Sequence, residues 1–494
     1  MPRKLSLLLL FFAAALALVH AAETPPTPHL VLQGEVHPSQ NQTYFEIPFE
    51  VPSGVHRITV YFENLGKADH TVLDLGIADP VRFRGASGGN KDHFTISETD
   101  ATPSYLPGTI IPGKWKLQIA VPNIRPNVTS RYRAEIYFNR VIDDTSFTEQ
   151  PLNDRPGWYR GDLHMHNAHS DGSCPSQSGK PAPCPLFFTV DAAARRGLDF
   201  IAITDHNTTA QYDAMRELQP YFDKLLFIPG RELTTFYGHA NLFGTTLFVD
   251  YRVGTPQVPD VNTMFRSARQ AGGIVSINHP ESPTGEICMG CGWTPKTPAD
   301  MSLVTAVEVM NGGGGHGFFP GIHFWEQQLR EGYRVTAIGG SDNHHADWPL
   351  DKVGSVGSPT TVVHAQNLSV AAILDGVRAG HVFLDFTGSR NKLLDLNAHD
   401  SAGSADMGDD LEPQKGETLT LKIHVVGCEG AMVGLLLDGH ESSDLPQQSI
   451  SSTDQTLDLK WTADGARHWL RAEVRDSQGQ LLLFGNPIYI GFKH

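Results

Sequence analysis

The sequence has little of several features that mark common classes of protein. Its 494 residues include 38 Lys and Arg against 54 Asp and Glu, a net charge of −16, so it lacks the basic excess typical of nucleic-acid binders. A glycine-rich phosphate loop ending in Lys and Ser or Thr does not occur. Only one long apolar run is present, at the N-terminus. These absences argue against a general nucleic-acid binder and a P-loop enzyme, and they favour a small molecule as the partner.

The N-terminal apolar run predicts an export signal. Arg3 and Lys4 precede an apolar segment at residues 7–19, and small residues follow where a signal peptidase would cut. The run is short for a membrane helix, which disfavours the alternative of an uncleaved anchor. We therefore expect residues 1–21 to be a signal peptide and the mature chain to begin near Ala22. The protein would then be periplasmic or extracellular, without a stable membrane span.

Cysteine is scarce, and all five cysteines lie beyond the expected signal peptide. Free thiols are prone to oxidation in an oxidising compartment, so we expect pairing. Cys174 with Cys184 and Cys288 with Cys291 are the expected disulfides, which leaves Cys428 unpaired. A redox pair or half of a zinc site remains an alternative for the short Cys288–Cys291 spacing.

The rest of the chain divides into three regions that differ in their sequence patterns. Residues 22–155 contain short β-prone runs broken by Pro, Gly and Asn, which predicts a small β-sandwich. Residues 156–388 alternate apolar β-prone runs with amphipathic stretches, as β/α barrels do. Short strands return in residues 389–494 and predict a second small β domain. The predicted fold class is therefore α/β, a β/α barrel flanked by two β-sandwich-like domains.

Individual elements are predicted from local patterns. Strands of the barrel are expected at residues 200–204, 225–229, 274–277, 306–310 and 335–338. Helices are expected at 189–196, 212–222, 261–271, 323–330 and 369–379. In the flanking regions, strands are expected at 44–51, 56–63, 71–75, 115–121, 132–139, 418–426, 431–437 and 469–475.

Histidine and carboxylate residues follow almost every predicted barrel strand, at the end where such barrels place their chemistry. The set is His164, His166, Asp171, His206, Glu232, His239, His279, Asp342 and His344. With 23 histidines in the chain, a single His-x-His pair is weak evidence for a metal site. A set of such residues that separate strands contribute is stronger evidence. Imidazole and carboxylate ligands in this mixture suit two or three adjacent divalent ions, with zinc, manganese and iron as the candidates.

The motifs around these residues resemble those of the polymerase and histidinol phosphatase (PHP) superfamily. They are GDLHMH at 161–166, TDH at 204–206, Glu232, NHP at 278–280 and SDNH at 341–344. The expected signal peptide, the flanking β regions and the segments 307–312 and 325–340 further resemble the CehA/McbA group, which is named for carbaryl hydrolases. The resemblance implies a distorted seven-stranded β/α barrel that holds two or three divalent ions.

The resemblance also implies a role for each residue. The main pair of ions would be held, with Glu232 bridging, by His164, His166, Glu232, His279, Asp342 and His344. Asp171 and His206 would serve a third position. For His239, a metal ligand and a substrate contact both stay open. Asp342 is the expected general base, and His239 is the candidate to polarise the substrate or protonate the leaving group.

Several neighbouring residues have simpler expected roles. Asp162 and Asp205 are expected to orient the ligand histidines by hydrogen bonds. Arg231 has two alternatives, contact with an anionic substrate and a salt bridge at the rim of the barrel. Gly340, with the glycine before it, is expected to let the strand end approach the ions closely.

The expected function is that of a secreted metal-dependent hydrolase. Clustered cations would activate a water for attack on a phosphoester, a carbamate or an ester of a small molecule. The alternative is a catalytically silent metal-binding scaffold, or a protein that binds glycans or a partner. The complete set of ligand residues favours the enzyme. Residues that determine substrate specificity are expected in the loops 284–298 and 312–320.

Overall fold

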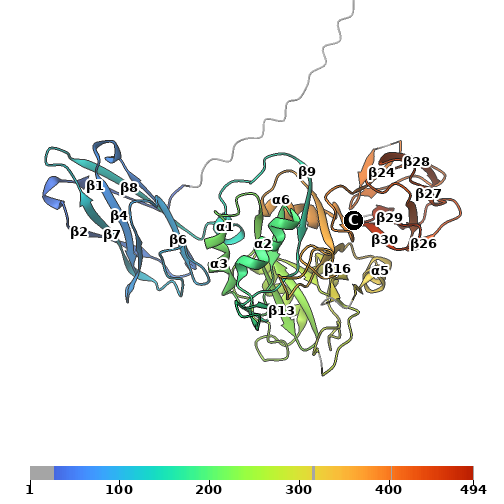
Figure 1. Ribbon diagram of the computed structural model, residues 1–494, viewed down its shortest axis with the longest axis horizontal. Helices are drawn as coiled ribbons and strands as arrows, with labels where there is room; N and C mark the ends of the chain where they lie inside the picture. Colours follow the sequence, from blue (N-terminus) through green and yellow to red (C-terminus); the bar gives the residue numbers. More distant parts are fainter. Residues whose placement is uncertain (1–26, 287, 314–316, 402, 493–494) are drawn as a thin grey trace, which may run out of the picture.

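A computed structural model describes residues 27–286, 288–313, 317–401 and 403–492. Three lobes lie in a row along the chain (Figure 1), with the longer helices in the central one. The expected signal peptide, residues 1–21, lies outside the described residues. Within them, no helix combines the length and the apolar character needed to cross a membrane.

The N-terminal lobe is a sandwich of two antiparallel sheets. Its strands are β1 (Leu30–Val36), β2 (Tyr44–Val51), β3 (Arg57–Asn64), β4 (Val72–Ala78), β5 (Phe83–Ser87), β6 (His93–Ser97), β7 (Gly113–Asn123) and β8 (Ser130–Phe138). One sheet has the order β1-β8-β3-β6 and the other β2-β7-β4-β5. Side chains such as Phe94 and Trp115 fill the core between the sheets. The strands expected in this region are confirmed.

The central lobe is built around one curved sheet. Its strands are β9 (Gly157–Asp162), β12 (Phe200–Ile203), β13 (Leu226–Thr235), β14 (Gly238–Phe243), β15 (Ile274–Ile277), β16 (Ala306–Asn311), β17 (Phe319–Pro320), β18 (Thr336–Gly340), β19 (Thr360–Ala365) and β20 (Val382–Asp385). Pairing follows the order β20-β19-β9-β12-β13-β14-β15-β16-β18, and β17 adds a short pairing to β16. The five expected strands are confirmed as β12, β13, β15, β16 and β18.

The central sheet is mixed, which differs from the expected barrel. β9, β12 and the first part of β13 are parallel, and so are β15, β16 and β18. From Gly230 onward, however, β13 turns into a hairpin with β14, and β19 is antiparallel to β9. A hairpin needs no crossover helix, so the regular β/α alternation is interrupted. The observed fold is thus mixed α/β and rich in strands, and a closed form of the distorted seven-stranded β/α barrel that the resemblance implies is not shown.

Amphipathic helices cover the central sheet. They are α2 (Leu186–Arg196), α3 (Gln211–Leu218), α4 (Val261–Gln270), α5 (Ile322–Arg330) and α6 (Val370–Ala379), and the short α1 (Val141–Thr145) precedes them. The side chains of Asp260 and Ser369 cap the first turns of α4 and α6 by accepting backbone hydrogen bonds. Gly197 and Gly380 end α2 and α6 in the left-handed conformation. All five expected helices are confirmed.

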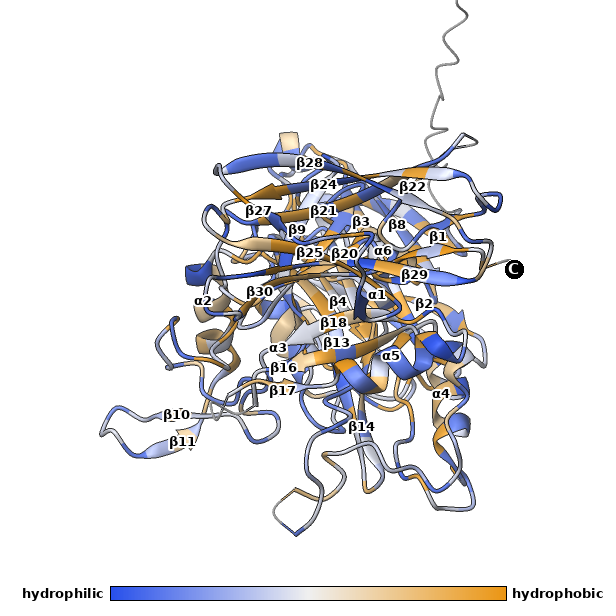
Figure 2. Ribbon diagram, turned by 90° about the vertical axis from the view of Figure 1, so that its right-hand side faces the viewer, coloured by the Kyte–Doolittle hydropathy of each residue, from blue (hydrophilic) through white to orange (hydrophobic). Residues whose placement is uncertain are grey.

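The C-terminal lobe contains two packed layers of strands. One sheet has the order β22-β21-β24-β28; its strands are β21 (Leu393–His399), β22 (Ser404–Asp406), β24 (Thr418–Val426) and β28 (Asp454–Thr462). The other layer contains β23 (Asp410–Leu411), β25 (Met432–Leu437), β26 (His440–Glu441), β27 (Gln448–Ser449), β29 (His468–Arg475), β30 (Leu481–Gly485) and β31 (Ile488–Ile490). Figure 2 shows β28, β24 and β21 above β25 and β29, with orange apolar stretches along the strands. The strands expected in this region are confirmed.

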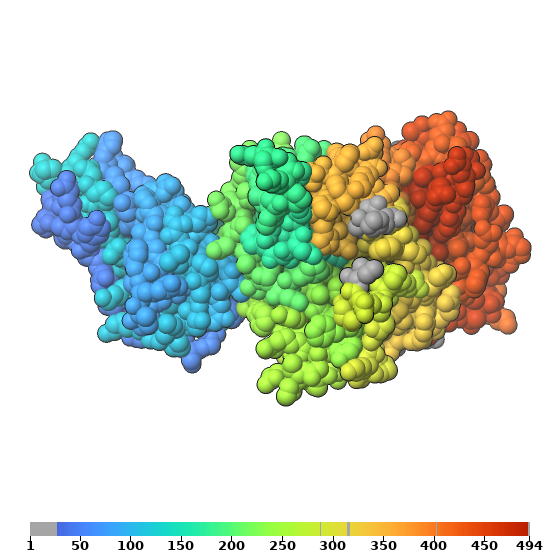
Figure 3. Space-filling model, turned by 60° about the horizontal axis from the view of Figure 1, so that its bottom comes forward, coloured from blue at the N-terminus to red at the C-terminus, as the bar shows by residue number. Residues whose placement is uncertain are grey.

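Both flanking lobes contact the central lobe, and Figure 3 shows the three lobes as a continuous row. On the N-terminal side, the buried carboxylate of Asp100 binds Arg57 at 2.7 Å and also Arg216 of α3 at 2.7 Å. On the C-terminal side, β20 pairs with β30, so the hydrogen-bonded sheet continues across residue 388. Trp325 of α5 packs edge-on against Trp469.

Candidate metal centre

The nine expected ligand residues come together at one end of the central sheet. His164, His166 and Asp171 follow β9, His206 follows β12, and His279 follows β15. Asp342 and His344 follow β18, while Glu232 and His239 lie on the β13–β14 hairpin. Because parallel strands end at the same edge of a sheet, segments more than 170 residues apart meet here, as between His166 and Asp342.

Glu232 lies at the centre of this cluster. Its Oε1 atom is 3.4 Å from His164 Nε2, 3.5 Å from His279 Nε2 and 3.2 Å from His239 Nδ1. Its Oε2 atom is 2.8 Å from His206 Nδ1 and 3.6 Å from His166 Nε2. One carboxylate thus reaches five imidazoles, the arrangement expected of a residue that bridges adjacent ions.

Three groups of possible ligand atoms are close enough to share an ion each, with all atoms of a group within 4.8 Å of one another. The first group is His166, Asp171, His206 and His344; the second is His164, Glu232 and His279; the third is His164, His166 and Asp342. The third group shares His164 and His166 with the other two, so the groups adjoin. His239 belongs to none of them, although it contacts Glu232.

Hydrogen bonds orient two of the imidazoles with a bare nitrogen toward the cluster. His279 Nδ1 donates to the backbone oxygen of Cys291 at 2.8 Å, and His344 Nδ1 donates to that of Asp342 at 2.8 Å. A carbonyl oxygen only accepts, so in each ring Nδ1 carries the hydrogen and the neutral ring has its lone pair on Nε2. Those Nε2 atoms face Glu232 and Asp171. This is the tautomer that a metal ligand requires.

Glu308 of β16 is a buried carboxylate that supports the cluster, although it is not among the site residues expected from the sequence. Its Oε1 atom is 3.0 Å from His164 Nδ1, and its Oε2 atom accepts from His279 N at 2.9 Å and from Asn311 Nδ2 at 3.0 Å. Asn311 Nδ2 also donates to Asp342 Oδ2 at 3.2 Å. The available signal was a lone charged residue in an otherwise apolar strand, since such a charge is buried only with partners.

The expected roles of Asp162 and Asp205 need correction. Asp162 accepts from the backbone nitrogens of His164, Ser341 and Gly357 at 3.1, 3.0 and 2.7 Å, so it ties the ends of β9 and β18 together. Asp205 accepts from the Ser170 hydroxyl at 2.6 Å, and that hydroxyl is 3.4 Å from His166 Nδ1. Neither carboxylate touches a ligand imidazole directly, because short side chains at these positions reach the backbone first.

Arg231 also differs from expectation. It is fully buried, and its Nη2 donates to the backbone oxygen of Leu247 at 3.1 Å. Its guanidinium lies over the ring of Phe248, 5.6 Å from the centroid. Among the described residues it makes no ion pair, so the expected rim salt bridge is wrong. Adjacent residues on a strand face opposite sides, which places Arg231 away from the side of Glu232.

Backbone geometry at the site is unusual in two ways. His279 and Asp342 have positive φ angles of 27° and 51°, which residues with a side chain rarely adopt. Gly340 packs so closely that an added Cβ would lie 2.3 Å from His164 Cβ and 2.6 Å from Glu308 Oε1. The glycine therefore makes room for His164, while the expected close approach of the strand end to the ions stays a prediction.

Both expected disulfides are joined in the structure, and Cys428 is buried and free. The Cys174–Cys184 bridge lies at the hairpin of β10 (Ser173–Pro175) and β11 (Pro181–Pro183), where Ser173 N donates to His344 O at 2.7 Å. The Cys288–Cys291 bridge lies in the loop whose Cys291 oxygen orients His279. Each bridge therefore adjoins a segment that positions one of the expected ligand residues.

The cluster is buried at one end and open at the other. The side chain of His164 is 1% exposed and that of Asp342 19%, whereas Asp171 is 59% exposed. His206 and His344 lie between these extremes at 25% and 26%. Solvent and a small molecule would therefore reach the cluster from the Asp171 side.

Charge within the cluster shifts the pKa values in opposite directions. Burial alone would lower the pKa of His279 and His344, but the carboxylates around them outweigh it and raise both to about 9. Burial and the neighbouring His344 and His206 lower the pKa of His166 to about 3. Burial alone would raise the pKa of Glu232, but the imidazoles around it hold that pKa well below its usual range. The cluster is thus a dense set of basic nitrogens and ionised oxygens from which divalent cations can displace protons.

The residues fit a divalent metal. Among the described residues, His164 Nε2, Glu232 Oε2 and His239 Nε2 are buried and meet no aligned hydrogen-bond partner, although Glu232 Oε2 lies 2.8 Å from His206 Nδ1. Each unpaired buried polar atom is costly. All three belong to the cluster. Nitrogen and carboxylate oxygen without thiolate suit zinc, manganese or iron.

An apolar cavity adjoins the open end of the cluster. Its volume is about 420 Å³, and the residues that line it include Asn207, Thr234, Phe236, Tyr251 and Met289. Thr234 connects cavity and cluster, since its Oγ1 is 2.6 Å from His206 Nδ1. Met289 comes from the loop 284–298, one of the two expected to choose the substrate; residues 287 and 314–316 of these loops lie outside the described residues.

Comparisons with known proteins give only weak similarities. No protein-family model and no curated protein matches. The crystal structure of a two-domain protein from Bacteroides vulgatus, described as containing a predicted PHP-like metal-dependent phosphoesterase, aligns with 69% of this chain and 97% of its own at 18% identity, with a TM-score of 0.38. The CARDB domain of a Pyrococcus furiosus protein aligns with 21% of this chain and 99% of its own at 11% identity, with a TM-score of 0.13.

Proposed function

We propose that this protein is a metal-dependent hydrolase of small-molecule esters with an apolar leaving group. The observation that carries the proposal is the buried cluster around Glu232, in which three polar atoms of the ligand set have no hydrogen-bond partner among the described residues. A purely structural cluster would satisfy those atoms internally. Strongly perturbed pKa values in a partly open site also favour a functional role over a structural one.

Two or three divalent ions belong to this proposal. His164, His166, Glu232, His279, Asp342 and His344 would hold the main pair, and Asp171 and His206 would hold a third ion. The three adjoining groups of ligand atoms support three positions, but they place His344 with Asp171 and His206 and not with the main pair. When bound, such ions activate water for attack and neutralise negative charge that develops on the substrate.

The protein side chains transfer protons and hold the reacting groups in position. Asp342 accepts the proton of the attacking water at its carboxylate, and Asn311 Nδ2 fixes that carboxylate by donating to Oδ2. Burial alone would raise the pKa of Asp342, but His164, His166 and His344 outweigh it and keep the carboxylate ionised at neutral pH. His239 acts on the substrate, to polarise it or to protonate its leaving group, while Glu232 Oε1, 3.2 Å from its Nδ1, holds the ring in place.

The apolar cavity supports the choice of leaving group. Phe236, Tyr251 and Met289 offer rings and a thioether in the cavity that Thr234 joins to His206, whereas a sugar phosphate would leave these surfaces unused. Carboxylic esters, carbamates and phosphoesters of an apolar alcohol or phenol all fit this description.

The proposal also covers the family, the export and the domain organisation of this protein. The motif resemblance supports assignment to the PHP superfamily and, within it, to the CehA/McbA group, with a distorted seven-stranded barrel. We also propose export after cleavage near Ala22 and a division into domains at residues 22–155, 156–388 and 389–494.

Hydrolysis by the metal-reconstituted chain tests the function. The probes are 4-nitrophenyl acetate, a 4-nitrophenyl carbamate, 4-nitrophenyl phosphate and bis(4-nitrophenyl) phosphate, each with zinc, manganese or iron. We expect turnover of at least one probe, loss of turnover on chelation, and a fall of roughly 100-fold or more in Asp342→Asn. A protein that binds ions but turns over no probe would support the silent scaffold instead.

A matched pair of variants tests the cavity. Phe236→Ala should raise KM for aryl esters and leave KM for methyl esters unchanged, because only the aryl group reaches the cavity. Phe248→Ala is the control, since Phe248 is also exposed but does not line the cavity. Equal effects of the two variants would contradict the assigned leaving-group site.

A further inference from the structure

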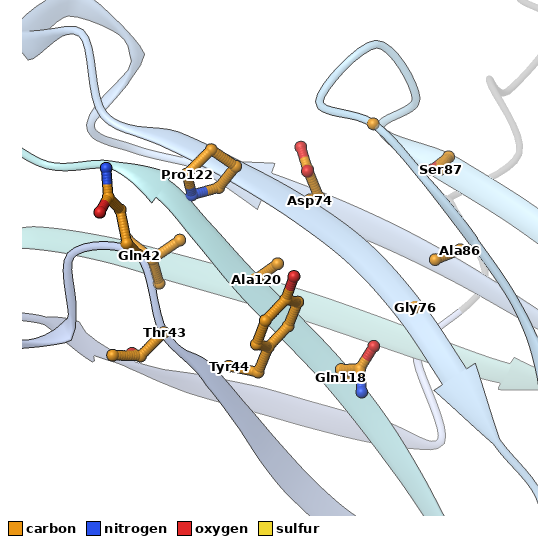
Figure 4. A pocket seen from close by; sticks show the side chains of 12 residues that line it. Gln42, Thr43, Tyr44, Asp74, Gly76, Ala86, Ser87, Gln118, Ala120 and Pro122 are labelled. Atoms are coloured by element: carbon orange, nitrogen blue, oxygen red, sulfur yellow. The ribbon is translucent and has the colours of Figure 1, made fainter.

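A second cavity lies on the N-terminal lobe, far from the metal centre in sequence. It occupies about 400 Å³ on the outer face of the sheet β2-β7-β4-β5, within the size range of small-molecule sites. Figure 4 shows the side chains of Tyr44, Asp74 and Gln118 on one side of this sheet, with Ala120 between them. Gln42 closes one end.

Strand register explains why the cavity forms there. Tyr44 pairs with Ala120, which pairs with Asp74, so these three side chains form a row across β2, β7 and β4. In the next row, Gln118 pairs with Gly76. Larger polar and aromatic residues therefore surround a floor of alanine and glycine. An added Cβ at Gly76 would lie 3.2 Å from Gln118 Oε1, so the missing side chain keeps the floor low.

The lining has a distinct chemistry. Tyr44 is an aromatic ring that is 73% exposed, although aromatic rings usually gain stability by burial. The side chains of Gln42, Tyr44, Asp74 and Gln118 make no hydrogen bond within the described residues, so amide, hydroxyl and carboxylate groups are available to a ligand. Lys and Arg are absent from the lining residues. The site thus offers a flat apolar ring and both donors and acceptors, but no positive charge for an anion.

From this arrangement we infer that the N-terminal lobe binds a neutral saccharide. One face of a pyranose ring is apolar and packs on the Tyr44 ring, while its hydroxyl groups both donate and accept. Gln42 and Gln118 offer amide donors and acceptors to those hydroxyls, and Asp74 accepts from them. The low floor of Gly76 and Ala120 lets the sugar ring approach the sheet.

An extended peptide fits this place less well. Peptides that join a sheet pair with the backbone of an edge strand, whereas this cavity lies over β7 and β4 in the interior of the sheet. An acidic glycan would meet the carboxylate of Asp74 without a compensating cation. The neutral saccharide is therefore the occupant that the lining favours.

Glycan-array binding of the whole chain tests this inference, followed by affinity electrophoresis in gels that contain β-glucan, xylan or galactomannan. Tyr44→Ala removes the stacking surface, and Ala120→Leu fills the floor. Tyr221→Ala is the matched control, because Tyr221 is also 73% exposed but lies on the central lobe. Circular dichroism and thermal unfolding verify that all variants fold.

We expect retention by at least one neutral glycan, a loss of affinity of tenfold or more in both Tyr44→Ala and Ala120→Leu, and wild-type affinity in Tyr221→Ala. Binding to no neutral glycan would overturn the inference, as would binding that only acidic glycans support or that both cavity variants retain. Metal content and ester hydrolysis are measured separately, so failure of the saccharide site leaves the proposed hydrolase unaffected.

Discussion

Glu308→Gln is the most informative perturbation of the candidate metal centre, because it changes one charge and hardly any volume. Both carboxylate oxygens of Glu308 face donors: Oε1 faces His164 Nδ1, and Oε2 accepts from His279 N and Asn311 Nδ2. A glutamine offers only one oxygen to these two sides. In either orientation, its NH₂ group must face a position that now requires an acceptor.

Each orientation of the new amide has a defined cost. If the NH₂ group faces His164, the Nδ1 atom must accept, the hydrogen moves to Nε2, and the lone pair that would bind an ion is lost. If the NH₂ group faces His279, two buried donors lose their acceptor, at about 1–3 kcal/mol for each unsatisfied group. Loss of such a supporting partner typically weakens metal binding about 10–100-fold, or roughly 1.4–2.7 kcal/mol.

Competition with a chelator of known affinity, for zinc and for manganese, measures this effect on the metal-stripped chain. Glu326→Gln is the control, because Glu326 is also a buried glutamate but pairs with Arg471 on the C-terminal side. We expect a loss of affinity in Glu308→Gln with a retained fold, and unchanged affinity in Glu326→Gln. Wild-type affinity in Glu308→Gln would refute the argument that this carboxylate sets the tautomer of His164.

Three further predictions follow from the same structure. His206→Ala should lower the metal content by about one ion per chain while the fold persists, and elemental analysis that finds no change would remove His206 from the ligand set. Gly340→Ala should lower metal affinity and stability together, because the new Cβ would overlap His164; unchanged metal titration and thermal unfolding would contradict that overlap. At the N-terminal junction, burial alone would raise the pKa of Asp100, but Arg57 and Arg216 outweigh it and hold that pKa far below its usual range. The stabilisation of the fold by the Asp100 carboxylate is therefore complete above the unfolded pKa of about 3.9 and is lost progressively as the pH falls below it. Urea unfolding should show Asp100→Asn to be less stable than the wild type by about 3–5 kcal/mol at pH 7, and the difference should be smaller at pH 3. A difference that does not change with pH would contradict this assignment.

Local sequence patterns were sufficient to predict many of the strands and helices. The strand at 274–277 and the helix at 261–271 were predictable because apolar periodicity and capping residues act over a few neighbouring positions. β14 was not predictable in this way, since its residues form a strand only through pairing with the second half of β13. The same hairpin turns the expected regular β/α alternation into a mixed sheet.

The sequence by itself determined which residue types stand at the ends of the central strands, and therefore that His164, Glu232 and Asp342 are candidates for one site. Only the tertiary structure decided how they meet, because distances between distant segments depend on strand order and register. It placed Glu308 behind His164, which no spacing along the chain indicates. It also brought Tyr44 and Asp74 to the two sides of Ala120, where the gap between two larger side chains becomes a cavity only after three strands have paired.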